Sequence, residues 1–108
     1  MQQHYLANEQ ISAFASSLVR AERTPATIEK YLRSVRAFFL YLDGRPVTKD
    51  AVVAWKEHLQ SVGGYSPSTV NASLASINDL FTFLGWPDCR AHYLKVQHRL
   101  FRDAGQEL

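Results

Sequence analysis

The sequence predicts an all-α domain, and three features of the chain support this. Apolar residues recur every three or four positions in four segments, which is the period of amphipathic helices. Glycine and proline fall between these segments, where helices end. Alternating runs of β-branched residues, which are typical of strands, do not interrupt them. Because 108 residues with 46% hydrophobic content fit one compact domain, we expect four amphipathic helices around a single core.

The first helix is expected to begin near Asn8 and the second near Thr24. The first presents Ile11, Phe14 and Leu18 on one face. The second has a hydroxyl cap at Thr24 followed by proline, which needs no amide partner at a helix start. Gly44 supplies its stop. Its apolar ridge is Ile28, Leu32, Val35, Phe39 and Leu42.

The third and fourth helices follow the same logic. Thr48 caps the third and Gly63 ends it, while Ser66 before proline caps the fourth and Gly85 ends it. The apolar ridge of the third is Val52, Trp55, Leu59 and Val62. That of the fourth is Val70, Leu74, Ile77, Phe81 and Leu84.

The second and fourth helices share a layout. In "TPATIEKYLRSVRAFFLYLDG" and "SPSTVNASLASINDLFTFLG", Thr27 matches Thr69 and Leu32 matches Leu74. Two amphipathic helices that pack alike explain the aromatic ends of these stretches. They do not explain why the first turns of the fourth helix are so small and polar.

Composition limits the function classes. Twelve Lys and Arg against ten Asp and Glu give a net charge of +2, which permits nucleic-acid binding without requiring it. A single cysteine, Cys89, cannot form an internal disulfide, and the sequence shows neither a signal-peptide pattern nor a membrane-spanning run. We expect a soluble cytoplasmic protein without a membrane partner.

Several residues together carry a family resemblance through their order and spacing: Thr27, Tyr31, Phe38, Gly44, Val47, Thr48, Ser66, Thr69, Leu74, Ile77 and Phe81. With this set, the chain over residues 9–86 resembles the N-terminal core-binding domain of phage integrases and other tyrosine recombinases. The tail "GWPDCRAHYLKVQHRLFRDAGQEL" resembles the segment that joins this domain to the catalytic domain in integrases of the conjugative-transposon type.

The resemblance implies a fold and partners. It implies a four-helix SAM-like bundle at residues 1–87 and a linker at 88–108 toward a catalytic domain beyond the chain. It also implies that the bundle clamps the core recombination site of double-stranded DNA, with other recombinase protomers as partners of the full-length protein. The helices beginning near Thr24 and Ser66 would present their N-terminal portions to the major groove, where amides and the helix dipole favour phosphate.

Candidate DNA contacts follow on these two helices. Thr27, Lys30 and Arg33 share a face away from the apolar ridge, where cations reach phosphates or guanine; the alternative is a solvated charged face. The fourth helix offers a small polar surface on which Asn71 suits adenine and Ala72 suits a thymine methyl. The alternative is a seam between helices. This surface consists of Ser68, Thr69, Asn71, Ala72 and Ser76, and Ser66 at the start of the helix is a further candidate contact.

The tail adds a third group of candidates. Lys95, Arg99 and Arg102 are spaced to follow a DNA backbone, and the alternative is a solvated terminal helix or tail. Leu94, Val96 and Leu100 are compatible with either a helix or an extended path.

Catalytic and metal sites are not expected in this chain. The family's chemistry uses a tyrosine nucleophile with arginines, a lysine and histidines, yet none of His4, His58, His92 and His98 has arginine three positions later. A tyrosine without such activating groups is inert. We therefore expect a recombinase fragment that is not itself an enzyme and needs no cofactor. Cys89 and His92 have the spacing of half a zinc site, which does not close a tetrahedron.

Two other classes compete with DNA binding by a recombinase domain. A helical protein-interaction module would show an exposed apolar patch and no salt-dependent DNA affinity. A helix-turn-helix repressor would need two short helices joined by a tight turn, whereas the helices expected here are longer.

Overall fold

The computed structural model describes residues 3–95, and it confirms the predicted all-α bundle. Four helices, α1 (Asn8–Arg20), α2 (Pro25–Leu42), α3 (Lys49–Ser61) and α4 (Pro67–Leu84), are followed by the short 3-10 helix η1 (Pro87–Cys89). Within residues 3–95 the extended pairing is limited to an isolated antiparallel bridge between His4 and Val47. Among these residues there is also no helix both long and apolar enough to span a membrane.

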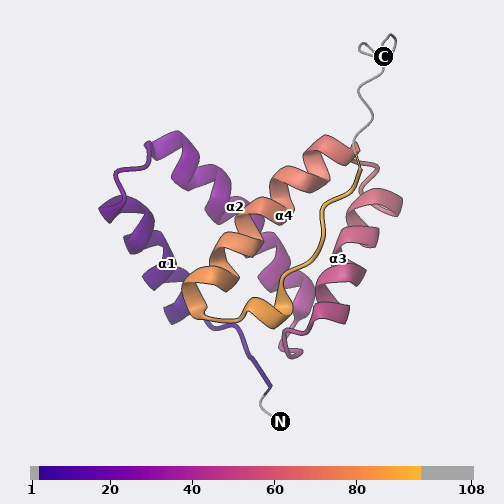
Figure 1. The fold of residues 1–108 in the computed structure, drawn as a ribbon, viewed down its shortest axis with the longest axis horizontal. Helices are drawn as coiled ribbons and strands as arrows, with labels where there is room; N and C mark the ends of the chain where they lie inside the picture. The colour runs from indigo at the N-terminus through magenta and orange to yellow at the C-terminus, as the bar shows by residue number, and fades with distance from the viewer. Residues whose placement is uncertain (1–2, 96–108) are drawn as a thin grey trace, which may run out of the picture.

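The long helices α2 and α4 form the centre of the bundle. In Figure 1 they cross, so that their N-terminal halves diverge like the arms of a V, with α1 and α3 at opposite sides. Both contribute fully buried residues to the core, including Val35 and Phe38 of α2 and Leu74, Ile77 and Phe81 of α4. The predicted apolar ridges therefore meet where the two helices pack, with one difference: Phe38 is fully buried, whereas Phe39, which was expected on the ridge of α2, is half-buried.

The predicted N-caps are confirmed at three helices. The hydroxyl oxygen of Thr24 accepts from the amide of Thr27 at 3.2 Å, and that of Thr48 accepts from the amide of Ala51 at 3.0 Å. Ser66 does the same for Thr69 at 3.3 Å. Each bond satisfies an amide that has no partner within its helix.

The predicted glycine at the helix end is confirmed for α4, whereas the C-caps of α2 and α3 lie one residue before the predicted glycine. Gly85 caps α4 in the left-handed conformation with φ of 76°. The α2 cap is Asp43, with φ of 49°, one residue before the predicted Gly44, because a short polar side chain tolerates this conformation. The α3 cap is Val62 rather than Gly63. Val62 was expected on the apolar ridge but is 73% exposed, because the chain leaves the helix at this point.

The packed core extends beyond residue 87. Cys89 and Ala91 are both buried, and residues 90–95 run in an extended path beside α4, back toward its N-terminus (Figure 1). The part of the expected linker that the structure describes is thus packed against the bundle.

Candidate nucleic-acid interface

The first turns of α2 and α4 are built in the same way. The hydroxyl of Thr24 donates to that of Thr27 at 2.9 Å, and the hydroxyl of Ser66 donates to that of Thr69 at 3.1 Å. Together with the amide bonds described above, these pairs close the first turn of each helix. The small polar residues at the helix starts therefore have a local structural reason, whether or not they also contact a ligand.

A groove lies between α2, α4 and the C-terminal end of α3. We call it the α2–α4 groove; its volume is about 510 Å³. Four of the predicted contact residues line it, two from each long helix: Lys30 and Arg33 from α2, and Thr69 and Ala72 from α4. The fold therefore brings together two groups of candidates that lie far apart in the sequence.

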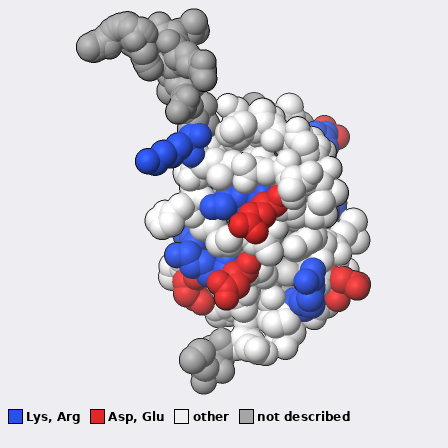
Figure 2. Space-filling view, turned by 90° about the vertical axis from the view of Figure 1, so that its right-hand side faces the viewer, with Lys and Arg blue, Asp and Glu red and all other residues white. Residues whose placement is uncertain are grey.

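The charged groups at the groove are open to solvent. Arg33 lies 3.8 Å from Glu29 on the next turn of α2, and both side chains are about three-quarters exposed, at 73% and 75%. An exposed ion pair of this kind is weak and screened by salt, so the guanidinium can exchange it for a phosphate. On the face that carries α3, basic and acidic side chains also lie side by side (Figure 2). That face therefore has no large area of one sign of charge.

The groove also contains residues that the sequence analysis did not include. His58 and Tyr65 line its third wall. The His58 ring stacks on Trp55, with ring centroids 5.6 Å apart, whereas Tyr65 is 52% exposed in the loop before α4. Helical periodicity cannot reveal a loop residue such as Tyr65; its position directly before the Ser66 cap was the available signal.

Other predicted contact residues lie elsewhere. Ser66 and Ser68 are exposed at the start of α4. Ser76 is 1% exposed, and its hydroxyl donates to the carbonyl of Ala72 at 3.3 Å. The prediction that Ser76 lies on an exposed polar surface is therefore wrong. Its burial agrees with the alternative, a packed seam between helices. On α2, Thr27 is half-buried.

The remaining candidates concern the chain after η1. Asn71 is half-buried, and its side-chain amide is bonded to the backbone of Leu94. Lys95, the next residue, is exposed. The expectations for Arg99 and Arg102 fall outside the described residues.

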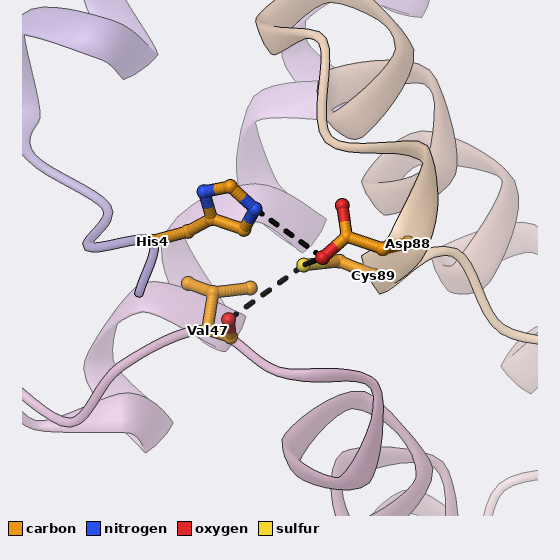
Figure 3. Close-up of polar contacts among 4 residues, drawn as sticks. All are labelled: His4, Val47, Asp88 and Cys89. Carbon is orange, nitrogen blue, oxygen red and sulfur yellow. Dashed lines mark hydrogen bonds and ion pairs between the residues drawn. The ribbon is translucent and has the colours of Figure 1, made fainter. Parts of the chain in front are cut away.

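One cluster offers three types of metal ligand. The Nε2 atom of His4 lies 3.3 Å from Oδ2 of Asp88, and the thiol of Cys89 lies 3.9 Å from that oxygen (Figure 3). The thiol also donates to the carbonyl of Val47 at 3.6 Å. Burial, and then the charge of Asp88, raise the pKa of Cys89 to about 11. Because a metal binds the thiolate, this environment favours a neutral thiol, which links η1 to the loop before α3 through Val47. The pair of His4 and Asp88 links the N-terminal segment to η1.

Cys89 and His92, from which no metal site was expected, have the spacing of half a zinc site in the sequence. His92 is exposed and is not part of the cluster of His4, Asp88 and Cys89.

Comparison with known proteins gives a family. Residues 6–87 match the family described as phage integrase, N-terminal SAM-like domain. Comparisons with curated proteins and with solved structures gave no match. The matched region contains all four helices and the α2–α4 groove, and the tail after residue 87 lies beyond it. The chain therefore belongs to the family of phage integrase N-terminal SAM-like domains.

Proposed function

We propose that this chain is a DNA-binding domain of a tyrosine site-specific recombinase and that it binds double-stranded DNA through the α2–α4 groove. The observation that carries the proposal is the meeting of Lys30 and Arg33 with Thr69 and Ala72 around this groove. A concave surface with exposed cations on one wall and the start of a helix on the other suits a phosphodiester backbone.

The residues around the groove have different roles in this proposal. Lys30 and Arg33 neutralise phosphates, which supplies affinity without sequence preference. Ser68 and Ala72, near the start of α4, face base edges in the major groove and supply specificity. Lys95 adds a phosphate contact beside them. Thr27 and Thr69 act mainly by closing the first helical turns.

The proposal extends to the parent protein. The family of this chain forms the N-terminal part of phage integrases, so strand cleavage is assigned to a separate catalytic domain of the same recombinase. In the full-length protein, other recombinase protomers are partners at the core recombination site, for integration or another recombination. A single free thiol is consistent with the reducing cytoplasm.

A titration of the chain with short duplex DNA, followed by amide NMR at low salt, tests the proposal. We expect the shifted amides to cluster at residues 30–34 and 65–73. Low salt is required because non-specific complexes are weak at physiological salt, with Kd values of about 10⁻⁴ to 10⁻⁶ M. An absence of shifts, or shifts confined to α1 and the exposed face of α3, would contradict DNA binding at this groove.

A protein-interaction module is the second candidate. Val62 and Tyr65, both exposed, give the surface around the end of α3 an apolar character that a protein partner would cover. In that case the affinity for DNA would be absent, and substitution of Tyr65 rather than of Lys30 would abolish binding of the partner.

A further inference from the structure

Two asparagines of α4 hold the backbone of the chain after η1. Nδ2 of Asn78 donates to the carbonyl of Ala91 at 3.1 Å, and its Oδ1 accepts from the Ala91 amide at 3.2 Å. Asn71 makes the same two bonds with Leu94, at 2.8 and 2.7 Å. Each side-chain amide thus replaces the neighbouring residue with which a strand exchanges two hydrogen bonds in an antiparallel sheet.

The spacing of the two asparagines matches the extended chain. Asn71 and Asn78 are seven positions apart on the α-helix, a rise of about 10.5 Å. Ala91 and Leu94 are three positions apart in extended chain, a span of about 10 Å. The segment of residues 90–95 can therefore be held at both points while it runs antiparallel to α4, as in Figure 1. From α3, Nζ of Lys56 adds a third contact, to the carbonyl of His92 at 3.1 Å.

The Asn71 contact lies beside the proposed DNA surface. Ala72, the next residue on α4, lines the α2–α4 groove, and Lys95 directly follows Leu94. The bonds to Leu94 thus determine where Lys95 leaves the bundle. They also use both groups of the Asn71 amide, whereas recognition of adenine by asparagine requires the carbonyl and the amino group together.

We infer that Asn71 is a positioning residue for DNA binding. It holds residues 90–95 on α4 so that Lys95 meets a phosphate at the edge of the α2–α4 groove, and it does not itself read a base. Asn78 holds the other end of the same segment. Only the DNA step of this inference rests on the proposed function, since the docking of the segment requires no DNA.

Hydrogen exchange of the free chain tests the docking. In Asn71→Ala the Leu94 amide loses its acceptor, and we expect its exchange to accelerate about tenfold, as for the loss of a hydrogen bond of ordinary strength. The Ala91 amide, bonded to Asn78, should keep most of its protection. Ser73→Ala is the matched control, because Ser73 lies on the same helix without a hydrogen bond to the described part of this segment. Unchanged exchange of Leu94 in Asn71→Ala would overturn the docking.

A double-mutant cycle tests the DNA step. Asn71→Ala, Lys95→Ala and the double variant are titrated with two short duplexes of unrelated sequence at several salt concentrations. If Asn71 acts through Lys95, Asn71→Ala weakens binding to both duplexes by the same factor and lowers the log-affinity versus log-salt slope by up to about 1, in the same direction as Lys95→Ala. The double variant should then bind no more weakly than Lys95→Ala.

The other outcomes contradict the inference. Additive losses confined to one duplex, with an unchanged salt slope, would show that Asn71 reads a base. A normal affinity in Asn71→Ala together with a loss in Lys95→Ala would show that the docking does not position Lys95. If the unsubstituted chain binds neither duplex, the proposed function and the DNA step both fail, and the exchange experiment alone decides the docking.

Discussion

Phe38 of α2 and Phe81 of α4 meet edge to face, with ring centroids 6.2 Å apart and ring planes at 75°. Both are completely buried. This aromatic pair lies in the contact between the two long helices, whose N-terminal halves diverge (Figure 1). The same two helices supply walls of the α2–α4 groove, so the core that joins them also supports the proposed DNA surface.

Replacing a core leucine of α4 should destabilise the whole bundle. Leu74 is fully buried, and Leu74→Ala removes apolar contacts and leaves a cavity, so the free energy of unfolding should fall by about 2 to 5 kcal/mol. Leu40→Ala is the control, because this leucine is 75% exposed and its truncation should change the same quantity by less than about 0.5 kcal/mol. Urea denaturation followed by circular dichroism measures both. Equal effects of the two variants would contradict the core described here.

Loss of the buried asparagine should also be costly. Asn78 is 2% exposed, and Asn78→Ala leaves the amide and carbonyl of Ala91 without their partners. We expect a loss of about 1 to 3 kcal/mol in the free energy of unfolding. Asp79→Ala, at the exposed next position, should change it by no more than about 0.5 kcal/mol. Thermal denaturation of both variants checks this, and a near-normal Asn78→Ala would mean that these bonds contribute little.

Capping and DNA contact can be separated at the start of α4. Ser66→Ala removes the cap of Thr69 and should cost about 1 kcal/mol of stability. Ser68 is exposed inside the first turn, so Ser68→Ala should leave stability nearly unchanged and weaken binding only to duplexes whose bases it contacts. Denaturation and duplex titration are measured on both. If Ser68→Ala binds every duplex normally, this residue is not a contact.

The cations of the groove should contribute to DNA affinity in a salt-dependent way. Lys30→Ala and Arg33→Ala should each weaken binding to all duplexes alike and reduce the log-affinity versus log-salt slope by about 1. Arg36→Ala is the matched control, because Arg36 is an exposed arginine of the same helix that lines a different hollow, facing α1. Fluorescence anisotropy at several salt concentrations measures the slopes. The same loss in Arg36→Ala would indicate a general charge effect rather than a site.

The buried thiol should make stability depend on alkaline pH. Burial, followed by the charge of Asp88, raises the pKa of Cys89 from 9.0 to about 11, so the folded protein keeps a proton that the unfolded chain loses. This contribution to stability is fully present below pH 9 and is lost as the pH rises to about 11.

The comparison with a variant isolates this contribution from other groups that titrate in the same range. Between pH 9 and about 11, the free energy of unfolding of the unsubstituted chain should fall relative to that of Cys89→Ala. A difference that stays constant would show that the thiol has no raised pKa. In the same folded protein, Cys89 should react slowly with alkylating reagents until denaturant is added.

The sequence by itself determined the local features of this protein. Capping depends on residues three positions apart, so Thr24, Thr48 and Ser66 mark their helix starts in the sequence as they do in the structure. The helical period of the apolar residues likewise identified most of the core, because a helix buries the face on which such residues recur. The family resemblance rested on the same positions and is confirmed by the match over residues 6–87.

Tertiary structure alone decided which of these features meet. The groove that joins Lys30 to Thr69 exists because α2 and α4 cross, and the crossing depends on side-chain packing that periodicity does not specify. For the same reason Ser76 is buried in a seam and Asn71 holds Leu94 instead of facing outward. A small or amide side chain suits a base edge, a helix seam or a neighbouring backbone equally well, and only its surroundings in the folded chain select among them.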